Sequence, residues 1–496
     1  MARRLSLATL DSLPQELRPL PDPRELAVGI VHLGLGAFHR AHQAVFTANA
    51  MAATGVGSWA ICGVSQRSRE VIDQLEPQDG LYTVLEREYG TRLSVLPPLR
   101  ELLFAQPQID ALIARIAAPA IRIVTLTVTE KGYRHNPASG RLRRADGEIV
   151  ADAQGRPPRT VVGQLVRGFQ ARQRQASGPL GVVCCDNLPR NGATVRRLVD
   201  EFCAMLPAAE GAPLMAWIGE NVAFPSTMVD RIVPAPTAAD RRDAAALLGL
   251  ADHGAVVAEP FSQWVIEDSF VSDRPQWERA GAIMAKDVEP YELMKLRLLN
   301  GPHSALAYLG ALAGYEYICD FVALDDVAAY VCALMDIEIT PTLAVPAGFD
   351  LEDYKRELLR RFANPGLRHR TEQIAMDGSQ KVPQRLLGTV ADRLAAGAEP
   401  RLGVLAVAGW MRFVTVARTD DGRALSVTDP LAARISELVA GAIAPGQVVD
   451  RLLALREVFG DLADDSRFRT LLEEALALLS RVGALAALRA VAGPAR

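Results

Sequence analysis

Cysteine, long apolar runs and long runs of one charge are all scarce in this chain. It has 496 residues but only six cysteines, and no two of them form a C-x-x-C pair. So few cysteines in a long chain are typical of a reduced intracellular protein and exclude a disulfide-stabilised scaffold. No apolar run reaches the length of a membrane span, and the apolar stretch after Met1-Ala2-Arg3-Arg4 is too short for a secretory signal. We therefore expect a cytoplasmic protein with no membrane partner.

An excess of either charge is also lacking. The chain has 54 basic and 58 acidic side chains, well mixed, for a net charge of −4. Without a basic run, nucleic acid is not expected as a partner, which leaves a small molecule. A composition of 49% hydrophobic and 23% charged residues is ordinary for a globular protein, and the length suffices for two or three domains. The oligomeric state stays open, and a monomer is allowed.

Short β-rich segments alternate with helical ones up to about residue 235. Alternation of this kind predicts an α/β fold, in which helices cover both faces of a parallel sheet. Residues 134–158, polar and rich in glycine and proline, are expected to form an insertion loop. The expected strands are 29–33, 59–64, 82–85, 121–129, 180–185 and 213–217, and the expected helices are 40–54, 108–116, 160–175, 191–206 and 236–250.

After about residue 285 the strand signals become scarce and the sequence is rich in alanine, leucine and arginine at helical spacing. We therefore expect two domains, residues 1–285 and a mostly α-helical domain of residues 286–496. The expected helical segments of the second domain are 290–314, 323–337, 352–362, 384–397, 403–416, 430–441, 446–458 and 466–493.

The stretch VHLGLGAFHRAHQ (31–43) places Gly34-x-Gly36 between an expected strand and an expected helix. In that position glycines let the backbone approach a pyrophosphate at the helix N-terminus, and Arg40 could pair with phosphate oxygens. The third glycine of G-x-G-x-x-G is missing, because His39 occupies its place. The alternative is a purely structural turn. His39 and His42 share a helix face but lack a third ligand nearby, so no metal is expected.

The residue that binds the adenosine ribose should follow the next strand. The sequence there reads Ser65-Gln66-Arg67-Ser68-Arg69-Glu70, and Glu70 is its only acid. An acid at this point binds the ribose hydroxyls of NAD, whereas an arginine favours the NADP phosphate. The pattern favours NAD and leaves NADP open.

A second signal is PYELMKLRLLNGPHSALAYLG (290–310), where Lys295, Asn300 and His303 stand among apolar residues. At about 100° per residue they fall near 0°, 140° and 80°, on one side of a helix. A partly buried lysine can act as a general base, and an asparagine amide can donate to a developing alkoxide. The alternative is a lysine that reaches solvent beside a core histidine. Pro302 predicts a kink or a fresh helix start, with Asn300 as its cap.

Further polar clusters follow expected strands, where open α/β sheets bind their ligands. Each cluster alone is typical of a turn, and together they would line the expected crevice. They are TVTEKGY (127–133) with Glu130 and Lys131, CCDNLPRNG (184–192) with Asp186, Asn187 and Asn191, and NVAFPSTMVDRIVP (221–234) with Asn221, Asp230 and Arg231.

These segments together resemble the polyol-specific long-chain dehydrogenases, the family of mannitol 2-dehydrogenase and fructuronate reductase (mannonate oxidoreductase). The resemblance runs from about residue 28 to about 465. It rests on GLGAFHRAHQ, TVTEKGY, CDNLPRNG, FPSTMVDRI, EPFSQWVIED and the Lys-x4-Asn-x2-His helix. It implies a Rossmann-type N-terminal domain, a helical C-terminal domain and an NAD-dependent oxidoreductase that uses no metal.

The resemblance also implies roles for individual residues. Lys295 would be the general acid/base, and His303 would bind substrate. Asn191 and Asn300 would hold the reacting oxygen. The one departure is Pro302, where the family usually has serine, and it affects the local backbone. Asp230 and Lys381 would contact the substrate chain, Gly34, Gly36 and Phe38 would form the cofactor loop, and Glu70 falls where the mannitol enzymes carry an acid.

The substrate question depends on NPGLRHRTEQIAMDGSQKVPQRL (364–386), which resembles the fructuronate reductases. Mannitol 2-dehydrogenases have an arginine where this chain has Gln373, whereas this chain has Arg368 and Arg370. A guanidinium can bind the carboxylate of a uronate bidentately, and a neutral polyol needs no such charge. The alternative is that both arginines form surface salt bridges. VTEKGY and AGWMRF also favour the uronate branch, and ICGVSQRS (61–68) favours the mannitol branch.

The expected reaction is therefore the interconversion of D-fructuronate and D-mannonate, with a sugar acid as the small-molecule substrate. We also hypothesise that Glu130 and Glu292 relay protons between Lys295 and water. Three alternatives remain: a mannitol or other polyol 2-dehydrogenase with the same machinery, a nucleotide-sensing protein that has lost catalysis, and a zinc polyol dehydrogenase.

Overall fold

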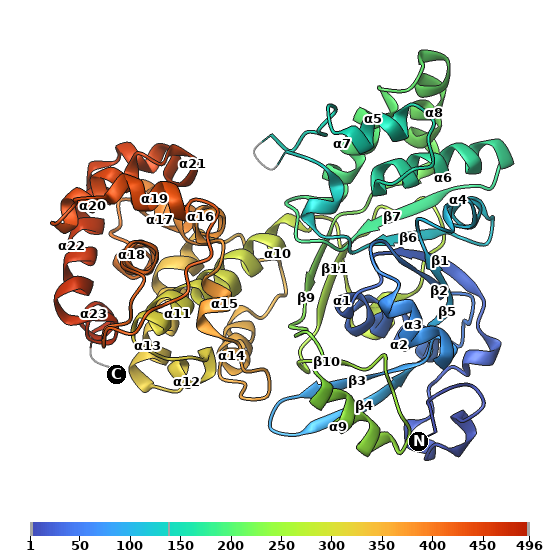
Figure 1. Cartoon of the computed structure of the whole chain (residues 1–496), viewed down its shortest axis with the longest axis horizontal. Helices are drawn as coiled ribbons and strands as arrows, with labels where there is room; N and C mark the ends of the chain where they lie inside the picture. The colour runs from blue at the N-terminus through green and yellow to red at the C-terminus, as the bar shows by residue number, and fades with distance from the viewer. Residues whose placement is uncertain (1–2, 137–138, 494–496) are drawn as a thin grey trace. The chain divides into compact units, whose positions relative to one another are not determined.

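The computed structural model describes residues 3–136 and 139–493, and it divides the chain into two compact units. The first unit is Met1–Glu289 and the second is Pro290–Arg496. Figure 1 shows that sheets occur in the first unit and that helices make up the second. None of the helices in the described ranges has both the length and the apolar character needed to cross a bilayer.

The central sheet of the N-terminal unit has six strands, all paired in parallel. Its order is β5-β2-β1-β6-β7-β8. Strands β2 and β5 are therefore added on one side of β1, and β6, β7 and β8 are then added on the other side. This is the Rossmann order, and it confirms the expected fold class. The crevice for a ligand lies at the carboxyl ends of β1 and β6, where the order reverses. The strands are β1 Val28–Leu33, β2 Ala60–Ser65, β5 Leu99–Phe104, β6 Ile123–Leu126, β7 Leu180–Cys184 and β8 Val222–Ala223.

Alternate residues of these strands enter two separate cores. Val31 of β1 and Val124 of β6 pack into one cluster with residues of α4, α6 and α7, whereas Ile30 and Ile123 pack into the other with α2. Both faces of the sheet are therefore buried, which explains the nearly continuous apolar strands. The helices of the unit are α1 Ala37–Ala41, α2 Gln43–Thr54, α3 Glu70–Leu75, α4 Ile109–Ala117, α5 Gly147–Ala153, α6 Val161–Gln175, α7 Asn191–Cys203, α8 Ala208–Asn221 and α9 Ala238–Leu248.

Two small sheets complete the N-terminal unit. One has the order β10-β3-β4 and the other β12-β11-β9. The expected strand 82–85 is therefore confirmed, although it lies outside the central sheet. The strands are β3 Tyr82–Arg87, β4 Thr91–Leu96, β9 Thr227–Asp230, β10 Val256–Ala258, β11 Gln263–Glu267 and β12 Ile283–Ala285.

Two expectations for the N-terminal unit are wrong. Residues 213–217 are part of helix α8, whose buried residues Gly211, Leu214 and Ile218 recur at helical spacing. The short apolar run looked like a strand because period and length are ambiguous over so few residues. Residues 134–158 are not all loop, because they contain α5, which Asp146 caps through bonds from the Glu148 and Ile149 amides.

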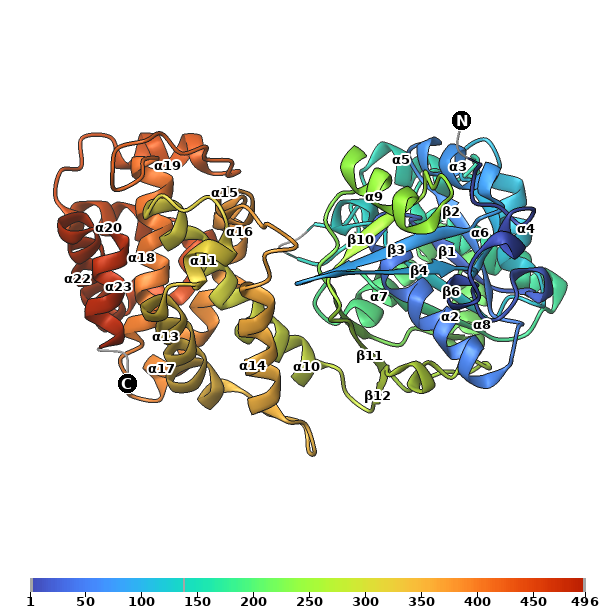
Figure 2. The ribbon, with the colours of Figure 1, turned by 90° about the horizontal axis from the view of Figure 1, so that it is seen from below.

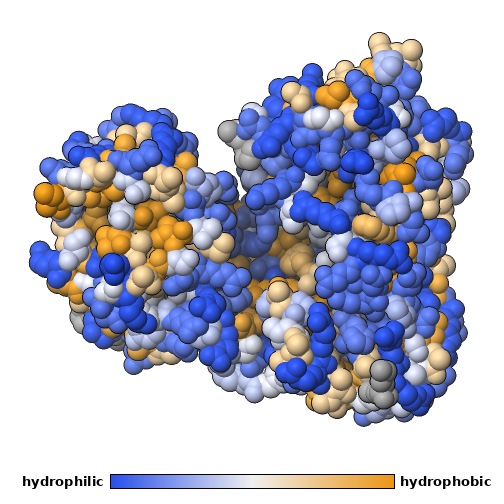
Figure 3. Space-filling model, in the orientation of Figure 1, coloured by the Kyte–Doolittle hydropathy of each residue, from blue (hydrophilic) through white to orange (hydrophobic). Residues whose placement is uncertain are grey.

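The C-terminal unit is helical, as expected, and residues 290–493 contain no strand beyond isolated bridges. Figure 2 shows α18 running between α11 on one side and α22 and α23 on the other. In Figure 3, polar residues cover most of the visible face of the N-terminal unit, and apolar ones gather on part of the C-terminal unit. The helices are α10 Glu289–Met294, α11 Gly301–Leu312, α12 Ile318–Val322, α13 Asp325–Ala333, α14 Leu351–Phe362, α15 Thr371–Ala375, α16 Gly378–Val382, α17 Gly388–Ala395, α18 Arg401–Val416, α19 Ala432–Val439, α20 Pro445–Leu453, α21 Arg456–Phe459, α22 Ser466–Val482 and α23 Ala484–Ala492.

The helix around Pro302 is continuous and contains a π-helical segment. Residues Lys295–Asn300 are π-helical and lead directly into α11, which has Pro302 as its second residue. The expected fresh helix start is not seen, because the helical backbone runs without a break from α10 through the π-helical segment into α11. The expected cap is wrong, because Asn300 has helical backbone angles and makes no side-chain capping bond.

Candidate active site

The glycine loop follows β1 and opens α1. Gly34 has φ +106°, and a Cβ placed on it would lie 2.1 Å from the carbonyl oxygen of Thr127, so only glycine fits. Gly36 is extended and exposed, and a Cβ there would meet nothing closer than the Gly34 oxygen at 3.8 Å. Gly34 is thus required by the fold itself, whereas Gly36 leaves open space for the close approach of a ligand beside the switch point.

Arg40 does not face this open space. Its side chain is buried, with Nη1 donating to the Gly254 carbonyl, Nε donating to Gly36 O, and the guanidinium 5.7 Å from the centre of the Tyr82 ring. The expectation that Arg40 pairs with phosphate is therefore not supported by the structure. The Arg40 guanidinium instead donates to the carbonyl of Gly254, which is far away in the sequence. Phe38 is only partly buried and stacks on His42, with ring centroids 5.0 Å apart.

Glu70 is exposed and is the first residue of α3, soon after β2 ends. Its carboxylate accepts a bond from Gln74 Nε2 at 3.2 Å. The neighbouring Arg69 donates to Asp73 at 2.8 Å and to Glu76 at 3.0 Å. Arg69 already pairs with two carboxylates, so it is not free to bind the 2′-phosphate of NADP. This arrangement favours NAD over NADP.

The turn after β6 carries Glu130 and is held by a buried carboxylate. Thr129 has φ +67° and ψ 155°, a strained conformation for a residue with a side chain. Asp186, which follows β7, accepts bonds from the Val128 amide at 2.9 Å, the Thr129 amide at 3.0 Å and the Tyr133 hydroxyl at 2.6 Å. Burial raises the pKa of Asp186, and these three bonds act in the opposite direction. Asp186 thus fixes the turn that presents Glu130 at the surface.

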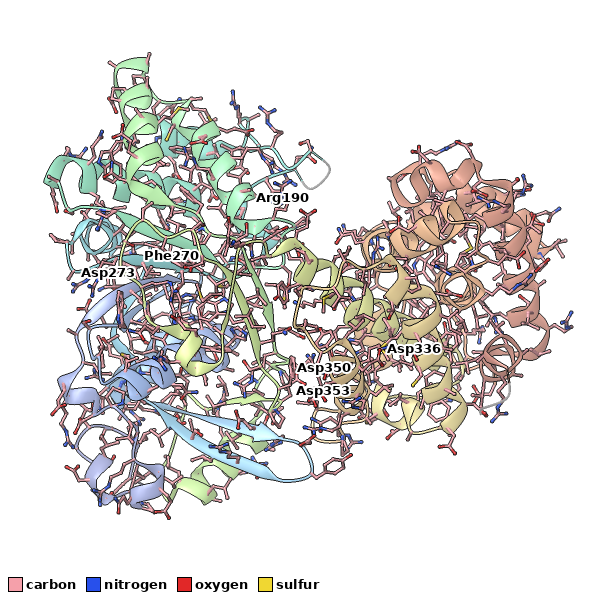
Figure 4. All side chains as sticks on the ribbon, turned by 180° about the vertical axis from the view of Figure 1, so that it is seen from behind. Arg190, Phe270, Asp273, Asp336, Asp350 and Asp353 are labelled. Atoms are coloured by element: carbon pink, nitrogen blue, oxygen red, sulfur yellow. The ribbon has the colours of Figure 1, made fainter. Side chains whose placement is uncertain are left out.

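Asn191 is the first residue of α7, directly after Arg190, which Figure 4 labels. The side chain is 1% exposed. Its amide nitrogen donates to Asp186 O at 3.1 Å and to Thr227 O at 2.9 Å, and its oxygen accepts from the Thr227 amide at 2.8 Å. Both amide hydrogens are therefore used inside the unit. To hold a reacting oxygen, as expected from the sequence, Asn191 would have to give up one of these bonds. Asp230, at the end of β9, is also buried.

The π-helical segment alters the expected geometry of the lysine helix. The Gly301 amide bonds to Leu296 O, five residues back, as in a π-turn. In such a turn Lys295 and Asn300, five residues apart, lie one above the other, so the 140° separation expected for an α-helix does not apply. Lys295, Asn300 and His303 are all partly exposed, whereas Leu298 and Leu299 between them are buried. Single π-turns inside helices recur at functional sites.

His303 lies beside two aromatic rings, and the charges of nearby cations lower its pKa. Its ring centroid is 5.5 Å from Phe362 and 5.6 Å from His369. Burial lowers the pKa of His303 well below its usual value, and His369, Arg385, Arg361 and Lys381 lower that pKa further. His303 is therefore a neutral imidazole near pH 7, in surroundings of positive charge.

The three cations come from separate elements. Arg361 is a buried residue of α14. Lys381 of α16 donates to Ile374 O at 3.2 Å, and burial followed by the charge of Arg385 lowers its pKa. Arg385, in the π-helical segment Pro383–Leu387, donates to Ser304 Oγ at 3.2 Å. Sequence reasoning singled out Lys381 alone. The spacing of Arg385, one turn after Lys381, was the signal available for a second cation.

Arg368 and Arg370 flank His369, whose ring centroid is 5.6 Å from that of His303, and each has a partner of its own. The Arg368 guanidinium is 4.4 Å from the Tyr317 ring centre, and Arg368 has φ +46°. Arg370 pairs with Glu316 at 3.3 Å, and both side chains are more than half exposed. This arrangement matches the alternative of surface contacts and gives no support to these two arginines as the carboxylate site.

The described residues contain no group of three or more His, Cys, Asp or Glu side chains arranged to hold a metal ion. His42 instead contacts Gln263 O at 2.9 Å through Nε2, and His39 packs inside the fold. Neither histidine of the glycine loop is therefore placed beside further ligands of the kind that zinc requires.

Comparison with known proteins gives full-length similarity. Two domain models match, the mannitol dehydrogenase Rossmann domain at residues 28–279 and the mannitol dehydrogenase C-terminal domain at residues 287–479. The D-mannonate oxidoreductase of Escherichia coli K12 is 44% identical over 464 residues, which cover 92% of this chain and 93% of that protein. A mannitol 2-dehydrogenase of Pyrenophora tritici-repentis is 38% identical, covering 97% of this chain and 85% of that protein. The structure of Pseudomonas fluorescens mannitol 2-dehydrogenase, a ternary complex with NAD and D-mannitol, aligns with a TM-score of 0.85 and 36% identity, covering 98% and 99% of the two chains.

Proposed function

The chain belongs to the mannitol dehydrogenase family of oxidoreductases, and from that premise we propose that it interconverts D-mannonate and D-fructuronate with NAD as the cofactor. The observation that carries the choice of substrate is that Arg385 donates to Ser304 Oγ at 3.2 Å, directly beside His303 in the chain, and that the charges of Arg385, Arg361 and Lys381 lower the pKa of His303. A site with this much positive charge favours a substrate that carries a carboxylate, which arginine can bind bidentately.

The residues of the glycine loop fit a dinucleotide. Gly36 leaves open space beside the switch point, Phe38 is partly exposed next to it, and Glu70 stands after β2 where an acid binds the ribose of NAD. NAD, when bound, supplies the hydride acceptor for oxidation of a secondary alcohol. The relative of known structure that holds NAD supports the same cofactor here.

The acid/base work falls to the π-helical segment. Lys295 takes the proton of the substrate hydroxyl during oxidation, and in its protonated form it returns the proton during reduction. Asn300, one π-turn away, donates to the oxygen as alkoxide character develops. Asn191 would add a second donor after exchanging one of its two internal bonds. His303, which stays neutral, orients a substrate oxygen.

The remaining residues position the substrate chain and move protons. Asp230 and Lys381 contact the hydroxyl groups, and Arg361 and Arg385 bind the carboxylate. Arg368 and Arg370 have a structural role in this proposal, because their charges are engaged with Tyr317 and Glu316. Glu130 and Glu292 relay the proton between Lys295 and water.

Initial rates of nicotinamide reduction test the proposal. D-mannonate and D-mannitol are each supplied with NAD and with NADP, and kcat/KM is compared across the four combinations. We expect D-mannonate with NAD to exceed D-mannitol with NAD by at least about a hundredfold, the discrimination that about 2.7 kcal/mol of charged contacts provides. A preference for D-mannitol would instead make the protein a polyol 2-dehydrogenase, the second candidate, which the mannitol 2-dehydrogenase relatives support.

A further inference from the structure

We propose that His32 and His39 form a stacked pair that positions the glycine loop. His39 occupies the place of the missing third glycine and sets the packing of helix α1 on strand β1 in its stead. The inference rests on the proposed use of NAD. It concerns two buried side chains to which the chemistry above gives no part. Neither touches the cofactor in this proposal, because both are completely buried.

His32 joins three segments that meet at the switch point. It lies in β1, and its Nδ1 is 2.8 Å from Thr125 Oγ1 in β6. Its Nε2 is 2.9 Å from Thr127 Oγ1 and 3.1 Å from the Gly34 carbonyl oxygen. The Thr127 hydroxyl also donates to Gly34 O at 2.8 Å. One ring therefore fixes the end of β1, the end of β6 and the first glycine of the loop.

The direction of these bonds follows from the donors available. Burial lowers the pKa of His32 to about 3, so the imidazole is neutral and has a single N–H. A proton on Nε2 lets that nitrogen donate toward Thr127 and Gly34, while Nδ1 accepts from the Thr125 hydroxyl. Every polar atom of the ring then has a partner, so rotating the ring would leave a buried group unpaired, at a cost in free energy.

His39 lies flat on His32. The ring centroids are 3.3 Å apart and the planes differ by 9°. His39 comes from α1, so the stack joins the first helix after the loop to the strand before it. In the usual motif a third glycine lets the helix pack closely on the strand. Here two parallel flat rings occupy that contact and set the separation of α1 from β1.

The His39 ring makes no well-formed hydrogen bond, although the Gln43 side chain lies near it. Its Nδ1 and Nε2 both lack a partner, as does Oε1 of the nearby Gln43. A buried polar group without a partner is costly, and an aromatic carbon ring in the same place would avoid that cost. The contribution of His39 to the loop is therefore its flat shape, and a phenylalanine should preserve it.

Four variants of the full-length protein test the pair through NADH binding, followed by the fluorescence of the cofactor. Thr127→Val removes the hydroxyl that links His32 to Gly34, and His39→Ala removes the stacked ring. We expect each to raise the Kd for NADH by at least about tenfold, while kcat at saturating cofactor changes less than threefold. His39→Phe should restore binding to within about threefold of the wild type. Thr83→Val is the matched control, since Thr83 is a buried threonine of the same unit that bonds to Asp252.

The outcomes separate this inference from the proposed function. If the wild type binds NADH and both Thr127→Val and His39→Ala bind it equally well, the inference is wrong and the function stands. If Thr83→Val loses as much affinity as Thr127→Val, or if His39→Phe binds no better than His39→Ala, the effect is general destabilisation and the inference is again wrong. If the wild type binds neither NADH nor NADPH, the proposed function fails and the inference fails with it.

Discussion

Each unit of the chain contains a pair of neighbouring histidine rings, and the two pairs have different surroundings. In the N-terminal unit His32 contacts threonine hydroxyls and a carbonyl, and His39 stacks on it. In the C-terminal unit His303 packs beside His369, at 5.6 Å between centroids, among arginine and lysine side chains. Burial is the largest cause of a lowered pKa for all four.

The comparison separates two uses of a neutral imidazole. The ring of His32 has its bonds completed within the protein and His39 stacks on it in a fully buried position, so the first pair suits a structural task. The second pair lies near arginine and lysine side chains whose charges lower the pKa of His303, and an anionic ligand would interact favourably with those charges. The lowered pKa is therefore common to both pairs, and what differs is the neighbours: hydroxyls and a carbonyl for His32, cationic side chains for His303.

The largest expected effect is the loss of the general base. Lys295→Ala should lower kcat about 10²–10⁴-fold near pH 7, because proton transfer then falls to water. Thermal unfolding should stay close to that of the wild type, since Lys295 is only partly buried. Unchanged turnover in this variant would move the chemistry out of the π-helical segment and remove the contrast between the two units.

The substrate contrast depends on Arg385. Arg385→Ala should lower kcat/KM for D-mannonate by about 10- to 100-fold, the effect of one hydrogen bond to a charged group, and should change the rate with D-mannitol less than threefold. Arg370→Ala is the control, because Arg370 is exposed and pairs with Glu316. Steady-state kinetics with both substrates provide the measurement. Equal losses with the two substrates would show that Arg385 contributes packing and not carboxylate recognition.

Both histidine pairs should make the protein less stable in acid, because both have lowered pKa values in the folded state. The folded protein lowers the pKa of His32 to about 3 and of His369 to about 4, whereas the unfolded chain has pKa values near 6.5. Below about pH 6.5 the unfolded state therefore binds protons that the folded state does not. Each histidine then lowers the free energy of unfolding by about 1.4 kcal/mol per pH unit, down to its folded pKa.

Urea unfolding at pH 7 and pH 5 measures this slope. His369→Asn should make the loss of stability between these values shallower by roughly 2 kcal/mol, from about 1.5 pH units of missing proton uptake. His253→Asn is the control, because His253 is exposed. An unchanged slope in His369→Asn would mean that His369 titrates normally in the folded protein, and the neutral pair in the C-terminal unit would be disproved.

The fold was largely predictable because its signals are local. Apolar strands between helices and Gly34-x-Gly36 at a strand end were sufficient for a Rossmann-type unit, and helical spacing was sufficient for the second unit. The strand predicted at residues 213–217 was wrong, because a short apolar run fits a strand and a helix equally well. The π-turn at Lys295–Asn300 could not be predicted from the sequence, because the spacing was interpreted with 3.6 residues per helical turn.

The candidate site was harder to predict because its surroundings are not local. Lys295, Asn300 and His303 share one short segment and were found from spacing. Arg361 belongs to a different helix, and only the tertiary fold brings its charge near His303. Arg40 was misassigned for the same reason, because the Gly254 carbonyl that accepts from it is far away in sequence. A charged side chain can be read as a ligand only when its internal partners are known.

The smallest expected effect concerns Glu130 and Glu292, the acids proposed to relay protons. Glu130 is exposed in the strained turn after β6, and Glu292 lies in α10, three residues before Lys295. Glu292→Gln and Glu130→Gln should each lower kcat about three- to tenfold and shift the pH–rate profile, because a glutamine cannot accept the proton that Lys295 passes on. Glu289→Gln, an exposed position in the same helix as Glu292, should leave both unchanged. If neither relay variant changes rate or profile, Lys295 exchanges protons with water directly, and the proposed relay is wrong.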